Sequence, residues 1–193
     1  MIQVKETEAL ALTQAWVEKA VIGLNLCPFA KPVHRRGAIR YAVSAAETEE
    51  ELLADLEREL HFLRAADPAE VETTLVIHPQ VLDDFLDYND FLGVVEEAVA
   101  DWGFEGEIQV ASFHPRYQFA GTRPDDLGNA TNRSPYPTLH LLREASVERA
   151  VAAVPDPAEI YEENLRTLEA LGREGWERLE EEMRRRQPLR APY

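Results

Sequence analysis

The stretch Thr73-Thr74-Leu75-Val76-Ile77-His78-Pro79 decides the fold. Its run of apolar and β-branched residues is too short for a helix and stops at a His-Pro dipeptide, which is typical of a buried strand. A second run, Ile108 to Phe113, stops in the same way at His114-Pro115. Between the two runs, apolar residues recur at helical spacing as far as Gly103. Strand, helix and strand therefore alternate.

The residues before this stretch extend the alternation. Apolar positions at helical spacing predict a first helix over Leu12 to Leu24, and Ile39 to Ser44 is the next expected strand. Thr48 and Glu51 form a capping-box pattern ahead of a second helix, which stops at Asp67-Pro68. Two strand-helix units thus precede the second His-Pro dipeptide.

The residues after the second dipeptide are less regular. Arg116 to Pro137 is rich in glycine and proline and reads as a long loop, which in a compact domain is more often functional than idle. Thr138 to Arg143 predicts a fourth strand, with a helix as the competing interpretation. A long last helix is expected from Asp156 onward. We expect residues 1–183 to form one globular domain and residues 184–193 to be a frayed tail.

This pattern predicts the α/β class, with α+β as the alternative. The expected architecture is a small mixed sheet of three or four strands packed with helices, in a ferredoxin-like or related arrangement. Parallel neighbours are expected for the first strands because helices connect them.

Composition limits the range of functions. The 193-residue chain has a formal net charge of −16, which disfavours binding to nucleic acid or to an anionic membrane. No apolar stretch has the length of a signal peptide or of a membrane span. The single cysteine, Cys27, cannot form an internal disulfide, which fits a cytoplasmic protein.

The two histidines that follow the strands form the first candidate site. If the strands are parallel neighbours, His78 and His114 emerge at the same edge of the sheet, where α/β proteins bind ligands. The proline after each histidine restricts the backbone, so the imidazoles could act as general acid and base. The alternative is that each dipeptide merely ends a strand.

Cys27 is the candidate nucleophile. It lies in a loop beyond a helix end, close to Lys31, His34 and Arg35, and cations lower the pKa of a thiol. His78 or His114 would serve as its base. The alternative is a small buried side chain, and the negative end of the preceding helix counts against a thiolate.

A metal interpretation has little support. Zinc could be bound by Cys27, His78 and His114, with His140 as a fourth ligand, but the spacing of these residues matches no known zinc motif. We therefore assign no metal ligands from the sequence.

The loop from Asn129 to Pro137 combines amides, hydroxyls and a guanidinium, and is suited to binding an anion. Arg133 could bind a carboxylate or phosphate in bidentate fashion. The alternative is that the polar side chains only satisfy the backbone of turns. The expected substrate-binding residues are Arg36, Arg116, Asn132, Arg133, Ser134, Tyr136 and His140.

Three separated motifs resemble a bacterial family. They are Gly23-Leu24-Asn25-Leu26-Cys27-Pro28-Phe29-Ala30, the stretch from Ala111 to Ala120, and Thr131-Asn132-Arg133-Ser134-Pro135-Tyr136-Pro137 with Leu139 to Arg143. The family is the one catalogued as domain of unknown function 1415, and the resemblance spans roughly Leu12 to Asn164. It implies a cytoplasmic bacterial-type protein and brings no established activity or cofactor.

Three functions remain open. The first is an enzyme that acts on a small anionic substrate at a pocket of Cys27, histidine and arginine side chains. The second is a non-catalytic module that binds an anion or metabolite in that pocket. The third is a structural or interaction role, in which the long last helix pairs with another copy to form a homodimer.

Overall fold

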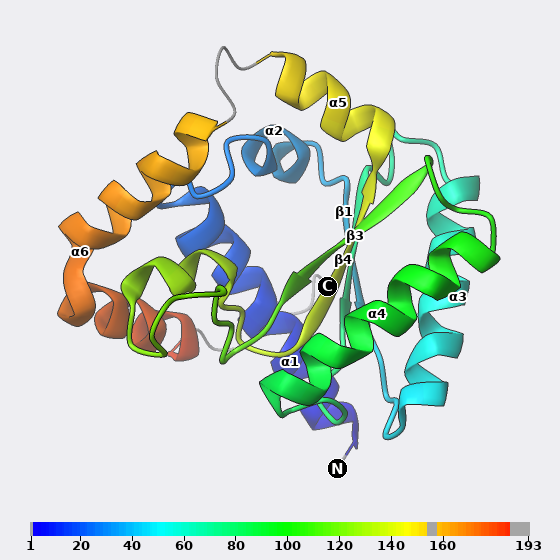
Figure 1. The fold of residues 1–193 in the computed structure, drawn as a ribbon, viewed down its shortest axis with the longest axis horizontal. Coiled ribbons are helices and arrows are strands. Elements are labelled where there is room, and N and C mark those ends of the chain that lie inside the picture. Colours follow the sequence, from blue (N-terminus) through cyan, green and yellow to red (C-terminus); the bar gives the residue numbers. More distant parts are fainter. Residues whose placement is uncertain (1, 154–157, 186–193) are drawn as a thin grey trace, which may run out of the picture.

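The computed structural model describes residues 2–153 and 158–185 of the chain. Figure 1 shows three layers, with a central sheet seen nearly edge-on and helices on both of its faces. α3 and α4 cover one face, whereas α1 and α6 cover the other. The protein therefore has the α/β fold with the mixed, helix-packed sheet that the sequence predicts.

The sheet has four strands in the order β1-β2-β4-β3. They are β1 (Ile39–Val43), β2 (Thr73–Ile77), β3 (Ile108–Phe113) and β4 (Thr138–Arg143). β1 and β2 are parallel, whereas β4 runs antiparallel to both of its neighbours, β2 and β3. β4 thus separates β2 from β3 and splits the β2-α4-β3 unit.

The helices α3 (Glu49–Ala65) and α4 (Phe85–Asp101) begin at well-defined caps. The Thr48 side chain accepts a hydrogen bond from the backbone N–H of Glu51, and the Glu51 carboxylate accepts one from the N–H of Glu47. Thr48 thus caps the helix as the predicted capping box requires, whereas Glu51 bonds to the N–H one residue before the N-cap. Asp84 caps α4 by accepting a hydrogen bond from the N–H of Leu86.

The opposite layer begins with α1 (Ile2–Trp16), which continues without a break as a π-helix, η1 (Val17–Ile22). The first helix is therefore longer than the predicted Leu12 to Leu24 segment. A short helix, α2 (Ala30–Arg35), follows in the region expected to be an irregular loop. Its six residues are too few to give a clear hydrophobic period.

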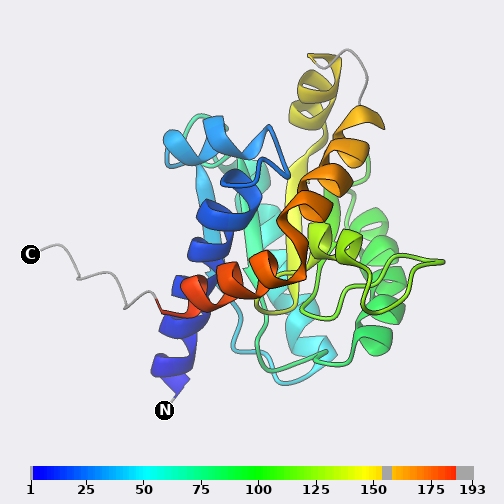
Figure 2. The same cartoon turned by 90° about the vertical axis from the view of Figure 1, so that its left-hand side faces the viewer.

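The chain after β3 also differs in detail from the prediction. The long loop contains a 3₁₀ helix, η2 (Leu127–Asn132), and α5 (Glu144–Ala152) follows β4 directly. The last helix, α6 (Ala158–Arg184), bends at Gly172, whose φ of 68° requires glycine. Figure 2 shows its second half crossing α1. Helix continues through Arg184, and residues 186–193 of the expected tail lie outside the described residues.

The alternation of side chains along the strands divides the core in two. Val76, Leu139 and Leu141 point toward α3 and α4. Leu75 and Ile77 point toward α1 and α6. β2 is buried at every position because it lies inside the sheet and is covered on both faces.

Candidate functional site

His78 and His114 lie at the same edge of the sheet, because each directly follows one of two strands that run in the same direction. The long loop returns over this edge. The backbone N–H of His78 donates to the carbonyl of Pro137 at 3.0 Å, and that of His114 donates to the carbonyl of Asn132 at 3.2 Å. The segment that leads into β4 is therefore fixed between the two histidines.

The ring of Tyr88, on α4, lies between the two imidazoles. Its centroid is 5.8 Å from that of His78 and 5.0 Å from that of His114. The Tyr88 hydroxyl donates to the carbonyl of Thr138 and accepts from the N–H of Phe113. All three rings are fully buried. The expected proximity of the histidines is present, but they form a packed cluster on the α4 side of the sheet.

Hydrogen bonds fix the tautomer of His114. Its Nε2–H donates to the carbonyl of Leu82 at 3.2 Å, and its Nδ1 accepts from the N–H of Arg116 at 3.0 Å. Both ring nitrogens are thus occupied by backbone groups. Burial also lowers the pKa of His114. The geometry leaves no ring nitrogen of His114 for a substrate proton.

His78 is only half satisfied. Its Nδ1–H donates to the carbonyl of Val81 at 3.0 Å, whereas Nε2 has no hydrogen-bond partner within the described part of the chain. Burial lowers the pKa of His78 to about 4, so the ring is neutral near pH 7. A neutral, unpaired Nε2 is a proton acceptor, but the fully buried side chain offers no route to it.

Cys27 lies at the opposite end of the sheet. It adjoins the start of α2, which precedes β1, and the parallel strands β1 and β2 begin at this end (Figure 1). A five-residue strand, roughly 15 Å long, separates it from His78. The expected convergence of Cys27 with the histidines is therefore not found.

The surroundings of the Cys27 thiol also differ from the expectation. The backbone N–H groups of Phe29 and Ala30, at the start of α2, favour a thiolate at its sulfur. Burial outweighs them and raises the pKa of the thiol. The predicted cationic activation is not seen among its contacts.

Three of the expected substrate-binding residues are held elsewhere. Arg36 pairs with Glu72 at 3.3 Å, at the end of the sheet where β2 begins. Arg116 donates to the carbonyl of Asp83 and is exposed beside the start of α4. His140 lies within β4 and donates to the Thr73 hydroxyl at 2.7 Å. Burial lowers the pKa of His140 to about 4.

Two residues of the Asn129 to Pro137 loop stabilise the loop itself. The Asn132 amide donates to the carbonyl of Ser112 at 3.2 Å. Arg133 donates from Nε to the carbonyl of Tyr117 at 3.1 Å and from one terminal nitrogen to that of Pro124 at 2.6 Å. This is the alternative that the sequence left open, in which polar side chains satisfy turns. It removes the bidentate face expected of Arg133.

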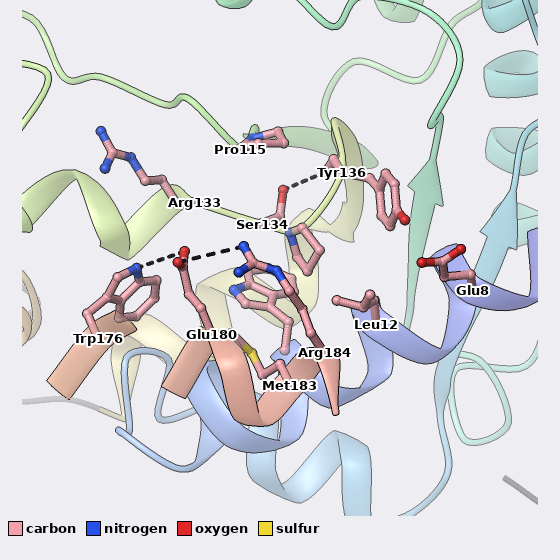
Figure 3. Close-up of a pocket in the computed structure, with 12 residues that line it drawn as sticks. Glu8, Leu12, Pro115, Arg133, Ser134, Tyr136, Trp176, Glu180, Met183 and Arg184 are labelled. Carbon is pink, nitrogen blue, oxygen red and sulfur yellow. Dashed lines mark hydrogen bonds and ion pairs between the residues drawn. The ribbon is translucent and has the colours of Figure 1, made fainter. Parts of the chain in front are cut away.

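A cavity of about 370 Å³ lies on the α1 and α6 side of the same sheet edge (Figure 3). α1 contributes Glu8, Leu12 and Trp16, which recur every four residues and so share one helix face. The loop contributes Pro115 and residues 133–136. Ser134 and Tyr136 of the predicted binding loop therefore line a cavity, although the histidines do not.

The remaining wall comes from the second half of α6. Trp176, Glu180, Met183 and Arg184 line it and also share one helix face. Gly172 redirects α6 so that this face meets α1 and the loop. Three segments that are distant in sequence therefore enclose the cavity.

Charged groups occupy both sides of the cavity. On one side, the Glu180 carboxylate accepts from the indole N–H of Trp176 at 3.1 Å and lies 3.8 Å from the Arg184 guanidinium. On the other side, Figure 3 shows the Glu8 carboxylate beside the Tyr136 hydroxyl. Burial and the charge of Glu8 raise the pKa of Tyr136. Charges of both signs thus line one cavity.

Trp16 contributes an unsatisfied donor to this wall. Its side chain is 2 % exposed and packs edge-on against Phe113, with ring centroids 5.2 Å apart. Its indole N–H has no hydrogen-bond partner among the residues whose side chains are described, 6–153 and 159–185. A buried N–H without an acceptor costs about 1–3 kcal/mol. An acceptor atom near Trp16 would remove this cost.

A family model described as "Protein of unknown function (DUF1415)" matches residues 8–178. The chain belongs to this family. The match includes the α1 wall, the loop and Trp176, and ends before Glu180, Met183 and Arg184. No curated protein and no solved structure matches the chain.

Most of the cavity wall is not predicted from the sequence. Leu12 and Trp16 fall within the predicted first helix, and Trp176 and Glu180 fall within the predicted last helix, where no motif distinguishes them. The signal that could have found the wall is a four-residue spacing on each helix. Glu8 and Trp16 follow this spacing on the first helix, and Trp176 and Glu180 follow it on the last. That signal does not reveal that the two helices face each other.

Within the described part of the chain, no three or more His, Cys, Asp or Glu side chains are grouped so as to hold a metal ion. Nor does any described helix combine the length and apolar character needed to cross a membrane.

Proposed function

We propose that this protein is a binding module that holds a small organic acid in the cavity between α1, α6 and the loop before β4. The observation that carries the proposal is the buried, unpaired indole N–H of Trp16 in a wall that also contains the Arg184 guanidinium. A carboxylate or similar oxygen is the ligand group that satisfies both donors.

The shape and lining of the cavity support this proposal. Its volume lies near the lower end of the range of roughly 300–1,000 Å³ that is common for small-molecule sites. Trp16, Trp176 and Met183 are almost fully buried and supply apolar surface, while a few polar groups could fix the ligand's orientation.

The geometry supports binding better than catalysis by the predicted residues. Cys27 is remote from the histidines, His114 has both nitrogens occupied, and His78 is enclosed in the core. A nucleophile and its base must lie within hydrogen-bond reach of each other, and this set does not. Among the described residues that line the cavity there is neither cysteine nor histidine.

Intrinsic fluorescence offers a direct test, because Trp16 and Trp176 line the cavity and Trp102 is the only other tryptophan. In a Trp102→Phe background, the remaining emission reports on the cavity alone. We expect at least one compound, in a panel of small carboxylic acids and phosphate esters at millimolar concentration, to change this emission and raise the melting temperature.

Variants then locate the binding site. Arg184→Gln should weaken binding roughly tenfold or more, because a charge-assisted hydrogen bond contributes about 1.5–3 kcal/mol. Trp16→Phe removes the N–H donor and keeps an aromatic ring. Thermal shift on this variant should show a similar loss of ligand affinity. Arg178→Gln, an exposed position on the same half of α6, is the matched control. Unchanged affinity in both cavity variants would place the ligand elsewhere and contradict the proposal.

A further inference from the structure

The cavity has two charged poles of different character. At one pole, Arg184 is a donor, and Glu180 is already engaged by Trp176 and by Arg184. Trp16, whose buried indole N–H has no partner, lines the same cavity. At the other pole, the Glu8 carboxylate has no ion-pair partner among the residues whose side chains the structure describes, 6–153 and 159–185. An anion is favoured at the first pole and a cation at the second.

The positions of these poles leave room for a ligand between them. Figure 3 shows Glu8 and Tyr136 on one side of the cavity and Glu180 with the Arg184 guanidinium on the other. Leu12 lies between them on the α1 side. A molecule that spans the cavity would therefore contact apolar surface in its middle and opposite charges at its ends.

The electrostatics of the loop strengthen the cationic preference at the second pole. Tyr136 has a raised pKa and stays protonated, so its hydroxyl adds no negative charge. Glu8 is then the charged group there, and Arg133 is turned away from it (Figure 3). A ligand ammonium would pair with Glu8 without competition from a protein cation in this part of the cavity.

We propose that the ligand is a zwitterion with an apolar body, of the α-amino acid class. Its carboxylate is bound by Arg184 and the Trp16 N–H, and its ammonium by Glu8. This inference rests on the proposed function, since it names the chemical class that the same cavity selects. Neither a simple acid nor a simple amine satisfies both poles.

The test compares three probes that share the leucine side chain by isothermal titration calorimetry on the full chain. Leucine carries both charges, N-acetylleucine carries only the carboxylate, and leucinamide carries only the ammonium. We expect leucine to bind roughly tenfold or more tightly than either analogue, since each loses one charge-assisted contact.

Two variants assign the poles. Glu8→Gln should weaken leucine to the level of N-acetylleucine and leave N-acetylleucine unchanged. Arg184→Gln should weaken leucine and N-acetylleucine together and leave leucinamide unchanged. The matched control is Glu6→Gln, two residues before Glu8 on α1 and not among the residues that line the cavity. It should behave as the parent protein.

The outcomes separate this inference from the proposed function. If N-acetylleucine binds as tightly as leucine, or if Glu8→Gln leaves their ratio unchanged, the zwitterion inference is overturned while acid binding in the cavity stands. Binding of other carboxylic acids without any binding of leucine has the same meaning. If no acid of any kind binds, the proposed function fails and this inference fails with it.

Discussion

The two faces of one sheet edge make different use of similar residues. On the α4 face, the rings of His78, Tyr88 and His114 fill the core and exclude solvent. On the α1 and α6 face, Trp16 and Trp176 line a cavity that charged groups surround. His114 and Pro115 are neighbours in the chain, yet one belongs to the packed cluster and the other to the cavity. Chemistry-bearing residue types at a sheet edge therefore do not by themselves mark a site.

Unpaired polar atoms sharpen this comparison. His78 Nε2 and Trp16 Nε1 both lack a partner among the described residues. His78 Nε2 is an acceptor in a closed core, whereas the indole N–H is a donor in the wall of a cavity. Trp16 is among the residues that line the cavity, whereas His78 is not. The same kind of defect thus has different consequences on the two faces.

The largest expected effect is the loss of stability in mild acid. Burial lowers the pKa values of His78 and His140 to about 4, so the folded protein does not protonate them between pH 7 and 5. The unfolded chain does, since its histidines titrate near 6.5. Stability should therefore fall as the pH falls, by up to roughly 2 kcal/mol for each histidine over this interval.

Urea unfolding at pH 7, 6 and 5 measures this dependence. His140→Gln should make this decrease in the free energy of unfolding smaller by up to roughly 2 kcal/mol, because one titrating histidine is lost. His61→Gln, at an exposed position, is the matched control. A stability that stays level between pH 7 and 5 would show that His78 and His140 take up protons in the folded state, and would contradict their burial.

The next effect concerns the packed face. Tyr88→Phe removes a hydroxyl that serves two backbone groups, the carbonyl of Thr138 and the N–H of Phe113. We expect a loss of roughly 2–3 kcal/mol, because two buried polar groups lose a partner. Tyr161→Phe is the control, since Tyr161 is 48 % exposed. A near-neutral Tyr88→Phe would mean that water reaches this cluster. Ligand binding in the opposite cavity should not change.

A smaller effect is expected at the bend that forms the cavity wall. Gly172 has a φ of 68° and a ψ of 172°, a conformation that costs side-chain-bearing residues on the order of 1–2 kcal/mol. Gly172→Ala should lose this amount and change the emission of Trp176. Gly93→Ala, inside α4 with open space around it, should be neutral or stabilising. Equal effects of the two substitutions would contradict a role of the bend in placing the wall.

The prediction of the fold succeeded where local signals were strong. Short β-rich runs with definite stops identified all four strands, and the Thr48 to Glu51 capping box placed the start of α3. The bend of the last helix at Gly172 is not predicted, because the backbone conformation there depends on what the helix packs against. The strand order β1-β2-β4-β3 is likewise not predictable from local signals, because it is set by pairing between strands that are distant in sequence.

The site was harder to predict, for a physical reason. The loop from Asn129 to Pro137 does contribute Ser134 and Tyr136 to a cavity, and the two His-Pro dipeptides do meet at one edge. Side chains alternate between the two faces of a strand, so the face that a residue occupies depends on its exact position in the strand. Whether that face is packed or adjoins a cavity depends on the helices that cover it. Trp16 and Trp176 are more than 150 residues apart, so their shared cavity has no local signature.

Cys27 gives the smallest expected effect and tests a third region, remote from both faces of the edge. Burial raises the pKa of its thiol in spite of the N–H groups of Phe29 and Ala30, so the thiolate should be scarce at neutral pH. Iodoacetamide should react more slowly with the native protein than with the urea-unfolded chain, because the thiolate is the reacting species. Cys27→Ala should lower the free energy of unfolding by less than about 1 kcal/mol, since sulfur is a weak acceptor.

The rate of Cys27 alkylation by iodoacetamide, measured across pH 5 to 9 by mass spectrometry, tests this prediction. An inflection below the free-thiol value of about 8.5 would show that the two backbone donors outweigh burial, and catalysis at Cys27 would again compete with binding in the cavity.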